Sequence, residues 1–267
     1  MVLERLKADL IRYAISPKNL TRLAQLEIFE KMDSTNSYLL NQGKKGAASG
    51  TVCFAEQQTN GRGRLGRVWH SPESANIYCS LLWRFSKTVK DYSSIGISLA
   101  VMIARALKRY GIHQGITLKW PNDILYLNRK LAGILLEQTR YSGLVIGIGV
   151  NLAFPETDQA VNKTHWIDLA EATDKPIARN DFAGIMLDEL LGGIPVYETQ
   201  GLQPFLKEWE IMDALVGSEI AVQTPQTIIV GNMCGINEAG ELLLQDETKK
   251  ILKFSYGEVT VRVKNKE

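Results

Sequence analysis

The residues best suited to chemistry lie in a short stretch in which three arginines alternate with three glycines. It reads GRGRLGR over residues 61–67 and continues as VWHSP to residue 72. Arginine offers a planar fork of donors for phosphate or carboxylate, and glycine lets backbone N–H groups approach an anion closely. We interpret the stretch as a phosphate-binding loop, with a solvated basic loop or a nucleic-acid backbone contact as alternatives. It is neither a GxxxxGK[ST] P-loop nor a dinucleotide fingerprint, which needs an apolar strand-to-helix frame.

Other charged or flexible residues stand at the ends of predicted strands. Lys119 and Asp123 flank a Trp-Pro-Asn turn and form a candidate ligand site, although Pro-Asn-Asp is also ordinary turn composition. Lys130 precedes an apolar run, where it could neutralise a carboxylate or phosphate; the alternative is a solvated turn lysine. Gly147 and Gly149 interrupt another apolar run, which indicates close approach of a ligand or backbone, with tight strand packing as the alternative.

Strands and helices must position these segments, and hydrophobic spacing predicts both. Strands are expected over residues 51–56, 77–85, 116–120, 124–127, 131–138 and 144–152. Helices are expected over residues 2–30 (interrupted at Pro17), near residue 35, and over 93–110, 180–200 and 203–213. Gly192, Gly193 and Pro195 predict a break or kink in the 180–200 helix. After Gly217, short strand-like runs between Gly, Asn and Asp turns are typical of a small β-barrel.

Composition excludes several classes of protein. The 267 residues carry 31 Lys and Arg against 29 Asp and Glu, a net charge of +2, which argues against a surface devoted to nucleic acid. The three cysteines form no CxxC pair, so neither a disulfide framework nor a thiolate metal site is expected. A reducing, cytoplasmic compartment fits this usage best. The charged N-terminus does not resemble a signal peptide, and no window has about 18 uninterrupted apolar residues, so no membrane span is expected.

Taken in order, these segments resemble the biotin protein ligase family from about residue 30 onward. The matching motifs are Ser34-Thr35-Asn36, Gln58 ahead of GRGRLGRVWHSP, KWPND (119–123), RKLAGILLE (129–137) and GIGVNL (147–152). The pairing of GRGRxGRxWxSP with KWPND is highly specific. Lipoate ligases and octanoyltransferases are similar in fold but lack that pair.

The resemblance implies a two-step reaction. Biotin and ATP, with Mg²⁺, give biotinyl-5′-AMP and pyrophosphate, and the biotinyl group passes to one lysine of a biotin carboxyl carrier protein domain of acetyl-CoA carboxylase or a related carboxylase. The implied fold is α+β: a mixed-sheet catalytic domain with flanking helices, then a small SH3-like β-barrel. We expect a helical N-terminal extension over 1–29, a catalytic biotin- and ATP-binding domain over 30–216, and the barrel over 217–267.

The resemblance also assigns candidate site residues. The catalytic candidates are Lys130, Arg64 and Asp123, with no metal ligand. Biotin-binding candidates are Ser34, Thr35, Asn36, Gln58, Arg62, Gly63, Arg64, Lys130 and Gly133. ATP- and adenylate-binding candidates are Arg62, Arg64, Arg67, Trp69, Lys119, Asn122 and Asn151. Trp120 and Trp166 either wall the site or pack in the core.

Arg64 and Lys130 can screen the repulsion between carboxylate and phosphate in the first step. A loop closed over the reactive adenylate would limit its hydrolysis. Asp123 is a candidate to orient or deprotonate the incoming lysine.

Many members of the family carry an N-terminal DNA-binding domain. Only 33 residues precede Ser34 here, fewer than the roughly 40 that an autonomous domain usually needs, so we expect the ligase-only form and no DNA partner. A homodimer is left open. The alternatives are a lipoate or octanoate ligase on the same fold, separated by an assay with biotin against lipoate, and a nucleic-acid-binding regulator, which would show a steep salt dependence.

Overall fold

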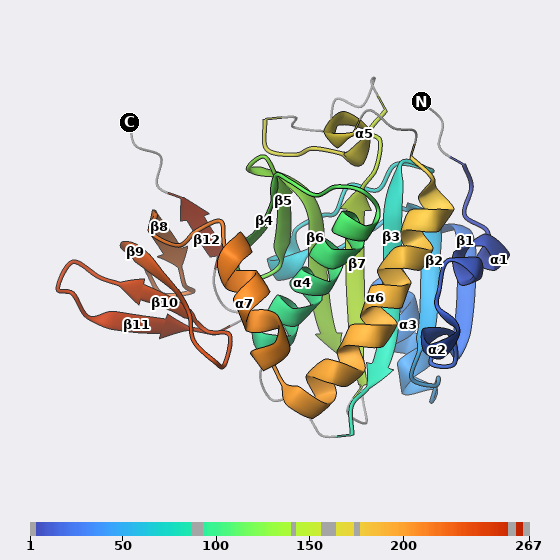
Figure 1. Cartoon of the computed structure of the whole chain (residues 1–267), viewed down its shortest axis with the longest axis horizontal. Helices are drawn as coiled ribbons and strands as arrows, with labels where there is room; N and C mark the ends of the chain where they lie inside the picture. The colour runs from blue at the N-terminus through green and yellow to red at the C-terminus, as the bar shows by residue number, and fades with distance from the viewer. Residues whose placement is uncertain are drawn as a thin grey trace.

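The computed structural model describes residues 4–86, 93–139, 143–155, 164–173, 177–255 and 260–263. Its main body is a seven-stranded mixed sheet in the order β1-β2-β3-β7-β6-β5-β4 (Figure 1). The strands are β1 (Gln25–Met32), β2 (Thr51–Gln58), β3 (Asn76–Arg84), β4 (Ile116–Lys119), β5 (Asp123–Tyr126), β6 (Arg129–Gln138) and β7 (Gly143–Asn151). β1 pairs in parallel with β2, and every other neighbouring pair is antiparallel. The predicted mixed sheet is confirmed.

Helices lie on both faces of this sheet. α4 (Ser93–Arg109), α6 (Arg179–Gln200) and α7 (Gln203–Met212) lie on one face, and α3 (Thr35–Lys44) lies behind the sheet (Figure 1). All nine residues of β7 are buried, as its unbroken apolar run predicts.

The helical prediction for residues 25–30 is wrong, because this segment is the start of strand β1. Upstream, residues 4–24 form two short helices, α1 (Ala8–Tyr13) and α2 (Pro17–Leu20). In β1, Leu26 stands opposite Val52 and Ile28 opposite Phe54, in the parallel register with β2. The spacing of the upstream leucines suits a helix, but pairing with β2 decides the conformation.

Of the break or kink predicted in the 180–200 helix, the break is not observed, since α6 is continuous over 22 residues. Pro195 has no N–H for the carbonyl of Leu191, and Arg22 Nη1 donates to that carbonyl instead, at 3.2 Å. A Cβ atom on Gly193 would stand 2.7 Å from Met102 Sδ of α4. The glycine therefore permits close packing of two helices rather than ending one.

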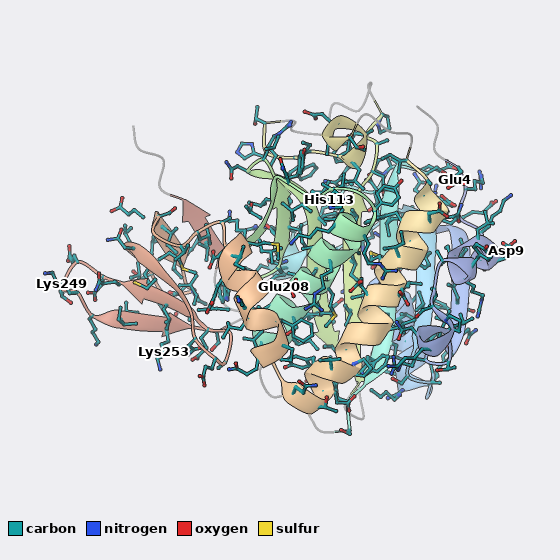
Figure 2. The ribbon with its side chains drawn as sticks, in the orientation of Figure 1. Glu4, Asp9, His113, Glu208, Lys249 and Lys253 are labelled. Carbon is teal, nitrogen blue, oxygen red and sulfur yellow. The ribbon has the colours of Figure 1, made fainter. Side chains whose placement is uncertain are left out.

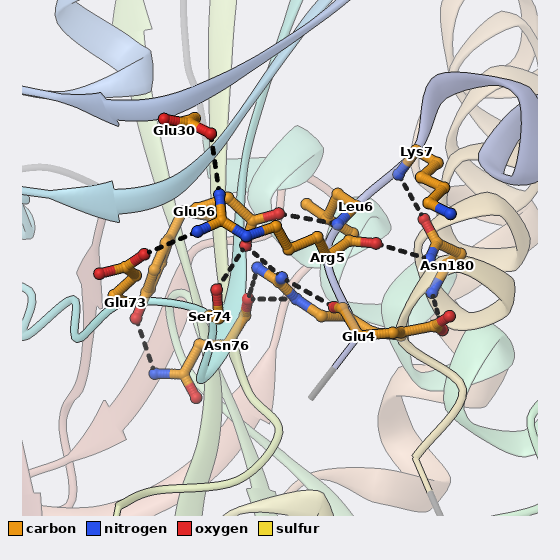
Figure 3. Close-up of polar contacts among 12 residues, drawn as sticks. Glu4, Arg5, Leu6, Lys7, Glu30, Glu56, Glu73, Ser74, Asn76 and Asn180 are labelled. Carbon is orange, nitrogen blue, oxygen red and sulfur yellow. Dashed lines mark hydrogen bonds and ion pairs between the residues drawn. The ribbon is translucent and has the colours of Figure 1, made fainter. Parts of the chain in front are cut away.

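Polar contacts also join the N-terminal segment to the sheet and to α6 (Figure 3). Glu56 of β2 forms a buried ion pair with Arg179, the first residue of α6, and also accepts from the backbone N–H of Leu6 at 2.7 Å. The Arg179 guanidinium is fully buried and donates to the carbonyl of Asn76 at 2.7 and 3.1 Å. Residues far apart in the chain are thus fixed around one buried charge pair.

The C-terminal strands form a separate antiparallel sheet in the order β11-β10-β9-β8-β12. They are β8 (Glu219–Gln223), β9 (Ile228–Ile236), β10 (Leu242–Gln245), β11 (Ile251–Phe254) and β12 (Thr260–Val263). The predicted run of short strands is confirmed, although no pairing between β11 and β12 that would close a barrel occurs among the described residues. Trp120 links the two sheets by donating to the Gly240 carbonyl at 3.0 Å. None of the helices in the described ranges is long and apolar enough to cross a membrane.

Candidate active site

A cavity of about 420 Å³ opens where the arginine-glycine loop, the start of α3 and strands β5 to β7 meet. The predicted site residues that line it are Ser34, Thr35, Asn36, Gln58, Arg62, Gly63, Arg64, Arg67, Trp69, Lys119, Asn122, Asp123, Lys130 and Gly133. Segments separated by about a hundred residues of sequence therefore converge on one space, as the motifs predict. Only Asn151 among the predicted residues does not line it.

The first turn of α3 supplies one polar wall of the cavity. Ser34 caps the helix by accepting from the N–H of Ser37, as its residue type predicts. Thr35 donates from its backbone N–H and its hydroxyl to Gln58 Oε1, at 2.9 and 3.2 Å. Ser34, Thr35 and Asn36 are each at most 4% exposed, so this wall is rigid and desolvated.

The arginine-glycine loop folds as a tight hairpin. Its backbone is closed by Gly63 N–H to Arg67 O at 2.7 Å and by Trp69 N–H to Gly61 O at 2.9 Å. A 3₁₀ turn, η1 (Arg64–Gly66), forms the tip, where Gly66 adopts a φ of 72°. This conformation suits glycine, which has no Cβ atom to clash. The hairpin thus holds its arginines over the cavity.

Trp69 packs against the backbone of two strand glycines, Gly133 and Gly149. A Cβ atom on Gly149 would stand 2.3 Å from Trp69 Cε2, and one on Gly133 would stand 3.0 Å from Cζ3. The strand glycines therefore make room for an aromatic ring from the loop. The sequence analysis had predicted a ligand, a backbone or tight strand packing at these glycines, but not this ring. The buried Trp69 Nε1 and Arg62 Nε have no hydrogen-bond partner in the described part of the chain.

Lys130 lines the cavity. Its Nζ lies 2.6 Å from Asp123 Oδ1 and 5.2 Å from the centroid of the Trp69 ring. Its backbone is fixed as well, because its N–H donates to His165 O at 2.7 Å and its carbonyl accepts from Ile167 at 3.0 Å. The alternative of a solvated turn lysine is therefore wrong.

The KWPND segment is also more than an ordinary turn. Asn122 is bonded to Ile134 of β6 through its side-chain amide at 2.7 Å and its backbone carbonyl at 3.0 Å. Its Oδ1 accepts from Arg64 Nη1 at 3.3 Å. Trp120 and Trp166 both line the cavity, and Trp120 is also 1% exposed core. Both readings of Trp120 therefore hold.

Asn151 lies behind the wall and does not reach the cavity. Its side-chain amide donates to Lys130 O at 3.2 Å and to Ile167 O at 3.1 Å. The residue is 4% exposed. It braces the backbone that carries Lys130 rather than presenting a group to ATP.

Sequence reasoning missed Glu137, which does not line the cavity but contacts two residues that do. Its Oε2 accepts from Arg62 Nη2 at 2.7 Å and from Asn36 Nδ2 at 2.8 Å. Strict strand alternation would place Glu137 and Lys130 on opposite faces of β6. A bulge reverses this, because Leu125 pairs with Lys130 while Ile124 pairs with Ala132. The RKLAGILLE motif contained the residue but not the bulge.

A cysteine also lines the cavity, on β3. Burial raises the pKa of the Cys79 thiol well above its usual value. The thiol therefore stays protonated and is unsuited to act as a nucleophile.

Comparison with known proteins agrees with this geometry. Residues 28–152 match the model of the biotin/lipoate A/B protein ligase family. The chain is 36% identical over 236 residues to the bifunctional ligase/repressor BirA of Escherichia coli. This alignment covers 86% of the present chain and 72% of BirA. It is 31% identical to the biotin–[acetyl-CoA-carboxylase] ligase of Mycobacterium tuberculosis, with 88% of each chain covered. The chain belongs to the biotin protein ligase family.

A solved structure extends the likeness to the whole ligase fold. The biotin protein ligase of Aquifex aeolicus in complex with biotin and ATP superimposes with a TM-score of 0.81 at 27% identity, over 90% of this ligase and all of that chain. The family model alone spans biotin and lipoate chemistry, but these named relatives are biotin ligases.

Proposed function

We propose that this biotin protein ligase forms biotinyl-5′-AMP in the cavity around Lys130 and then transfers the biotinyl group to a lysine of a biotin carboxyl carrier protein domain. In the first step a biotin carboxylate oxygen bonds to the α-phosphorus of ATP and the bond to pyrophosphate breaks. In the second, the acceptor amine attacks the acyl carbon and AMP leaves. The observation that carries the proposal is the convergence of Lys130, Arg62 and Arg64 on one cavity walled by Thr35 and Gln58.

Lys130 meets the electrostatic demand of the first step. Two anions must approach each other, and a fixed ammonium between them stabilises the charge of the transition state. Its 2.6 Å pairing with Asp123 holds it in place before substrates arrive. When the substrate anions bind, they take over part of that pairing.

Asp123 then has a role in the second step. An acceptor lysine with an ordinary pKa of about 10.4 carries a proton that it must lose before it attacks. Asp123 stands beside Lys130, within the same cavity. We assign it the orientation and deprotonation of the incoming amine.

The two ends of the cavity suit the two substrates. At the α3 end, Thr35, Asn36 and Gln58 present neutral polar groups and Trp69 presents an apolar face, which suits a bicyclic urea. Toward the KWPND turn, the cationic and amide side chains of Arg64, Arg67, Lys119 and Asn122 suit phosphate and ribose.

Mg²⁺ accompanies ATP in this account. No group of three or more His, Cys, Asp or Glu side chains that could hold a metal occurs in the ranges the structure describes. Mg²⁺ commonly keeps several waters and binds through substrate phosphates, so the nucleotide itself supplies its ligands. When bound, the ion neutralises phosphate charge.

The acceptor is the carrier domain of acetyl-CoA carboxylase or a related carboxylase, as the name of the M. tuberculosis relative suggests. We assign the chemistry to a catalytic unit over 30–216 and the five-stranded sheet to a C-terminal unit over 217–267. No DNA partner is proposed. Incubating the ligase with biotin, ATP, Mg²⁺ and a purified carrier domain should give carrier labelled on a single lysine. Absence of label, with intact carrier, would refute the transfer step.

A further inference from the structure

One oxygen of Glu137 joins the arginine-glycine hairpin to helix α3. Oε2 accepts from Arg62 Nη2 at 2.7 Å and from Asn36 Nδ2 at 2.8 Å. Arg62 lies at the start of the hairpin, and Asn36 lies in the first turn of the helix. The carboxylate is partly shielded, with the Glu137 side chain 25% and the Arg62 side chain 34% exposed. A charge-assisted contact is stronger when it is partly removed from water.

The polar chain continues from Asn36 to the far end of the same hairpin. Ser80 Oγ lies 2.5 Å from Asn36 Oδ1 and 2.8 Å from Thr35 Oγ1. Thr35 donates to Gln58, whose Nε2 donates to Ser71 Oγ at 3.1 Å. Ser71 follows the hairpin in sequence. Both ends of the hairpin are therefore tied to one helical turn. Within this polar chain, the Glu137–Arg62 contact is the ion pair, and the links through Ser80, Thr35, Gln58 and Ser71 join neutral groups.

The position of Asn36 in the chain is narrowly determined. A Cβ atom on Gly147 would stand 2.2 Å from Asn36 Oδ1. The Asn36 amide therefore fits only because Gly147 has no side chain. In that position it contacts Ser80 on one side and Glu137 on the other. Asn36 thus has little freedom to replace a lost partner.

We propose that Glu137 is a positioning residue for biotin, an inference that rests on the proposed function. It acts through Arg62 and Asn36, because it fixes the loop arginine against the helix before biotin arrives. When a loop is already ordered before the ligand binds, no part of the binding free energy is spent on ordering it, and the affinity is higher. Neutralising Glu137 should therefore weaken biotin binding and raise the KM for biotin. It should change kcat and the KM for ATP less than the KM for biotin, because Glu137 also holds Asn36 at the biotin end of the cavity, while Lys130 and Asp123 are untouched.

The test compares Glu137→Gln with a matched control, Glu208→Gln. Glu208 of α7 (Figure 2) also pairs with an arginine, Arg105 of α4, at 2.5 Å, and does not line the cavity. Calorimetry with biotin alone should show Kd raised about tenfold in Glu137→Gln, a loss of about 1.4 kcal/mol, and unchanged in the control. Glu137→Asp keeps the charge and should recover part of the affinity. Limited trypsin digestion after Arg62 should be faster in Glu137→Gln without ligand.

The outcomes separate this inference from the function on which it rests. If wild type and Glu208→Gln bind biotin and Glu137→Gln binds it equally well, the inference is overturned and the proposed function stands. If Glu137→Gln raises the KM for biotin and ATP equally, or if Glu137→Asp is no better than Glu137→Gln, the residue is merely structural and the inference is again overturned. If wild type itself binds no biotin, the proposed function fails.

Discussion

The indole of Trp69 lies on the backbone of Gly149, where a Cβ atom would stand 2.3 Å from Trp69 Cε2. Gly149 belongs to β7, a strand buried along its whole length. The strand cannot retreat without disturbing β3 and β6, which pair with it on both sides. A side chain at position 149 would therefore displace the ring and with it one wall of the cavity.

Gly149→Ala should thus lower kcat/KM for adenylate formation by about tenfold to a hundredfold, since small displacements of a positioned group carry penalties of this order. Steady-state kinetics with varied biotin measures the effect. The double variant Trp69→Phe/Gly149→Ala should lose less than the two single losses combined, because the smaller ring leaves room for the methyl group. Unchanged kinetics in Gly149→Ala would show that Trp69 does not shape the site.

Arg64→Gly should release the intermediate rather than abolish its synthesis. Arg64 holds the hairpin to the KWPND turn through its 3.3 Å contact with Asn122. Glycine removes that contact and adds backbone freedom. Released biotinyl-5′-AMP would acylate lysines of bystander proteins, so serum albumin mixed with the variant, ATP and biotin should become biotinylated. Albumin label no stronger than with wild type, alongside normal carrier labelling, would remove Arg64 from the loop closure.

The sequence located the cavity because its motifs are short turns that carry their own chemistry. Lys130 and Asp123 were both identified from such segments, and the structure brings them within 2.6 Å. The contact role of Glu137 was not predicted, because its orientation depends on a bulge in β6, and no residue type in the segment indicates that bulge. Gly149 of β7 was predicted to mark a close approach, but the residue that approaches it, Trp69, lies eighty positions earlier in the sequence.

The same limit explains the misassigned elements. Strand β1 forms because it pairs in parallel with β2, and such long-range pairing is invisible to local spacing. Likewise α6 tolerates Pro195 because a distant arginine, Arg22, satisfies the freed carbonyl of Leu191. Local rules fail at these places since tertiary contacts replace what the local sequence lacks.

Glu56→Gln should destabilise the fold by about 3 kcal/mol, because it leaves the buried Arg179 guanidinium without an anionic partner. Glu30→Gln is the matched control, since Glu30 pairs with Arg5 at the surface and its side chain is 87% exposed (Figure 3). Exposed pairs of this kind contribute roughly 0–1 kcal/mol. Urea unfolding followed by circular dichroism measures both variants. Equal stability of the two would contradict the structural role assigned to the Glu56–Arg179 pair.

Asp188 should make stability depend on pH at the acidic end. Burial opposes its ionisation, but hydrogen bonds from Ser16 and Asn19 and the contact with Arg109 outweigh burial, so the pKa of the folded carboxyl is lowered. The folded state therefore binds this proton less readily than the unfolded state. The stabilisation is present above the unfolded pKa and is lost as pH falls through the folded one.

Melting temperatures of wild type and Asp188→Asn, measured from pH 7 down to pH 3, provide the test. The wild type should be more stable at pH 7, and the difference should shrink as the pH falls. A difference that stays constant across this range would contradict the lowered pKa.

The account depends most on Lys130 as the cation between biotin carboxylate and α-phosphate. The decisive measurement is biotin-dependent exchange of labelled pyrophosphate into ATP, by wild type, Lys130→Ala and the neighbouring control Arg129→Ala, whose guanidinium pairs with Glu171. Wild type and control should exchange with biotin but not with lipoate or octanoate. Lys130→Ala should lose about 2–4 kcal/mol of transition-state stabilisation, roughly a thirtyfold to thousandfold slower exchange. Exchange by Lys130→Ala near the wild-type rate, or exchange by wild type that ignores biotin, would contradict the account.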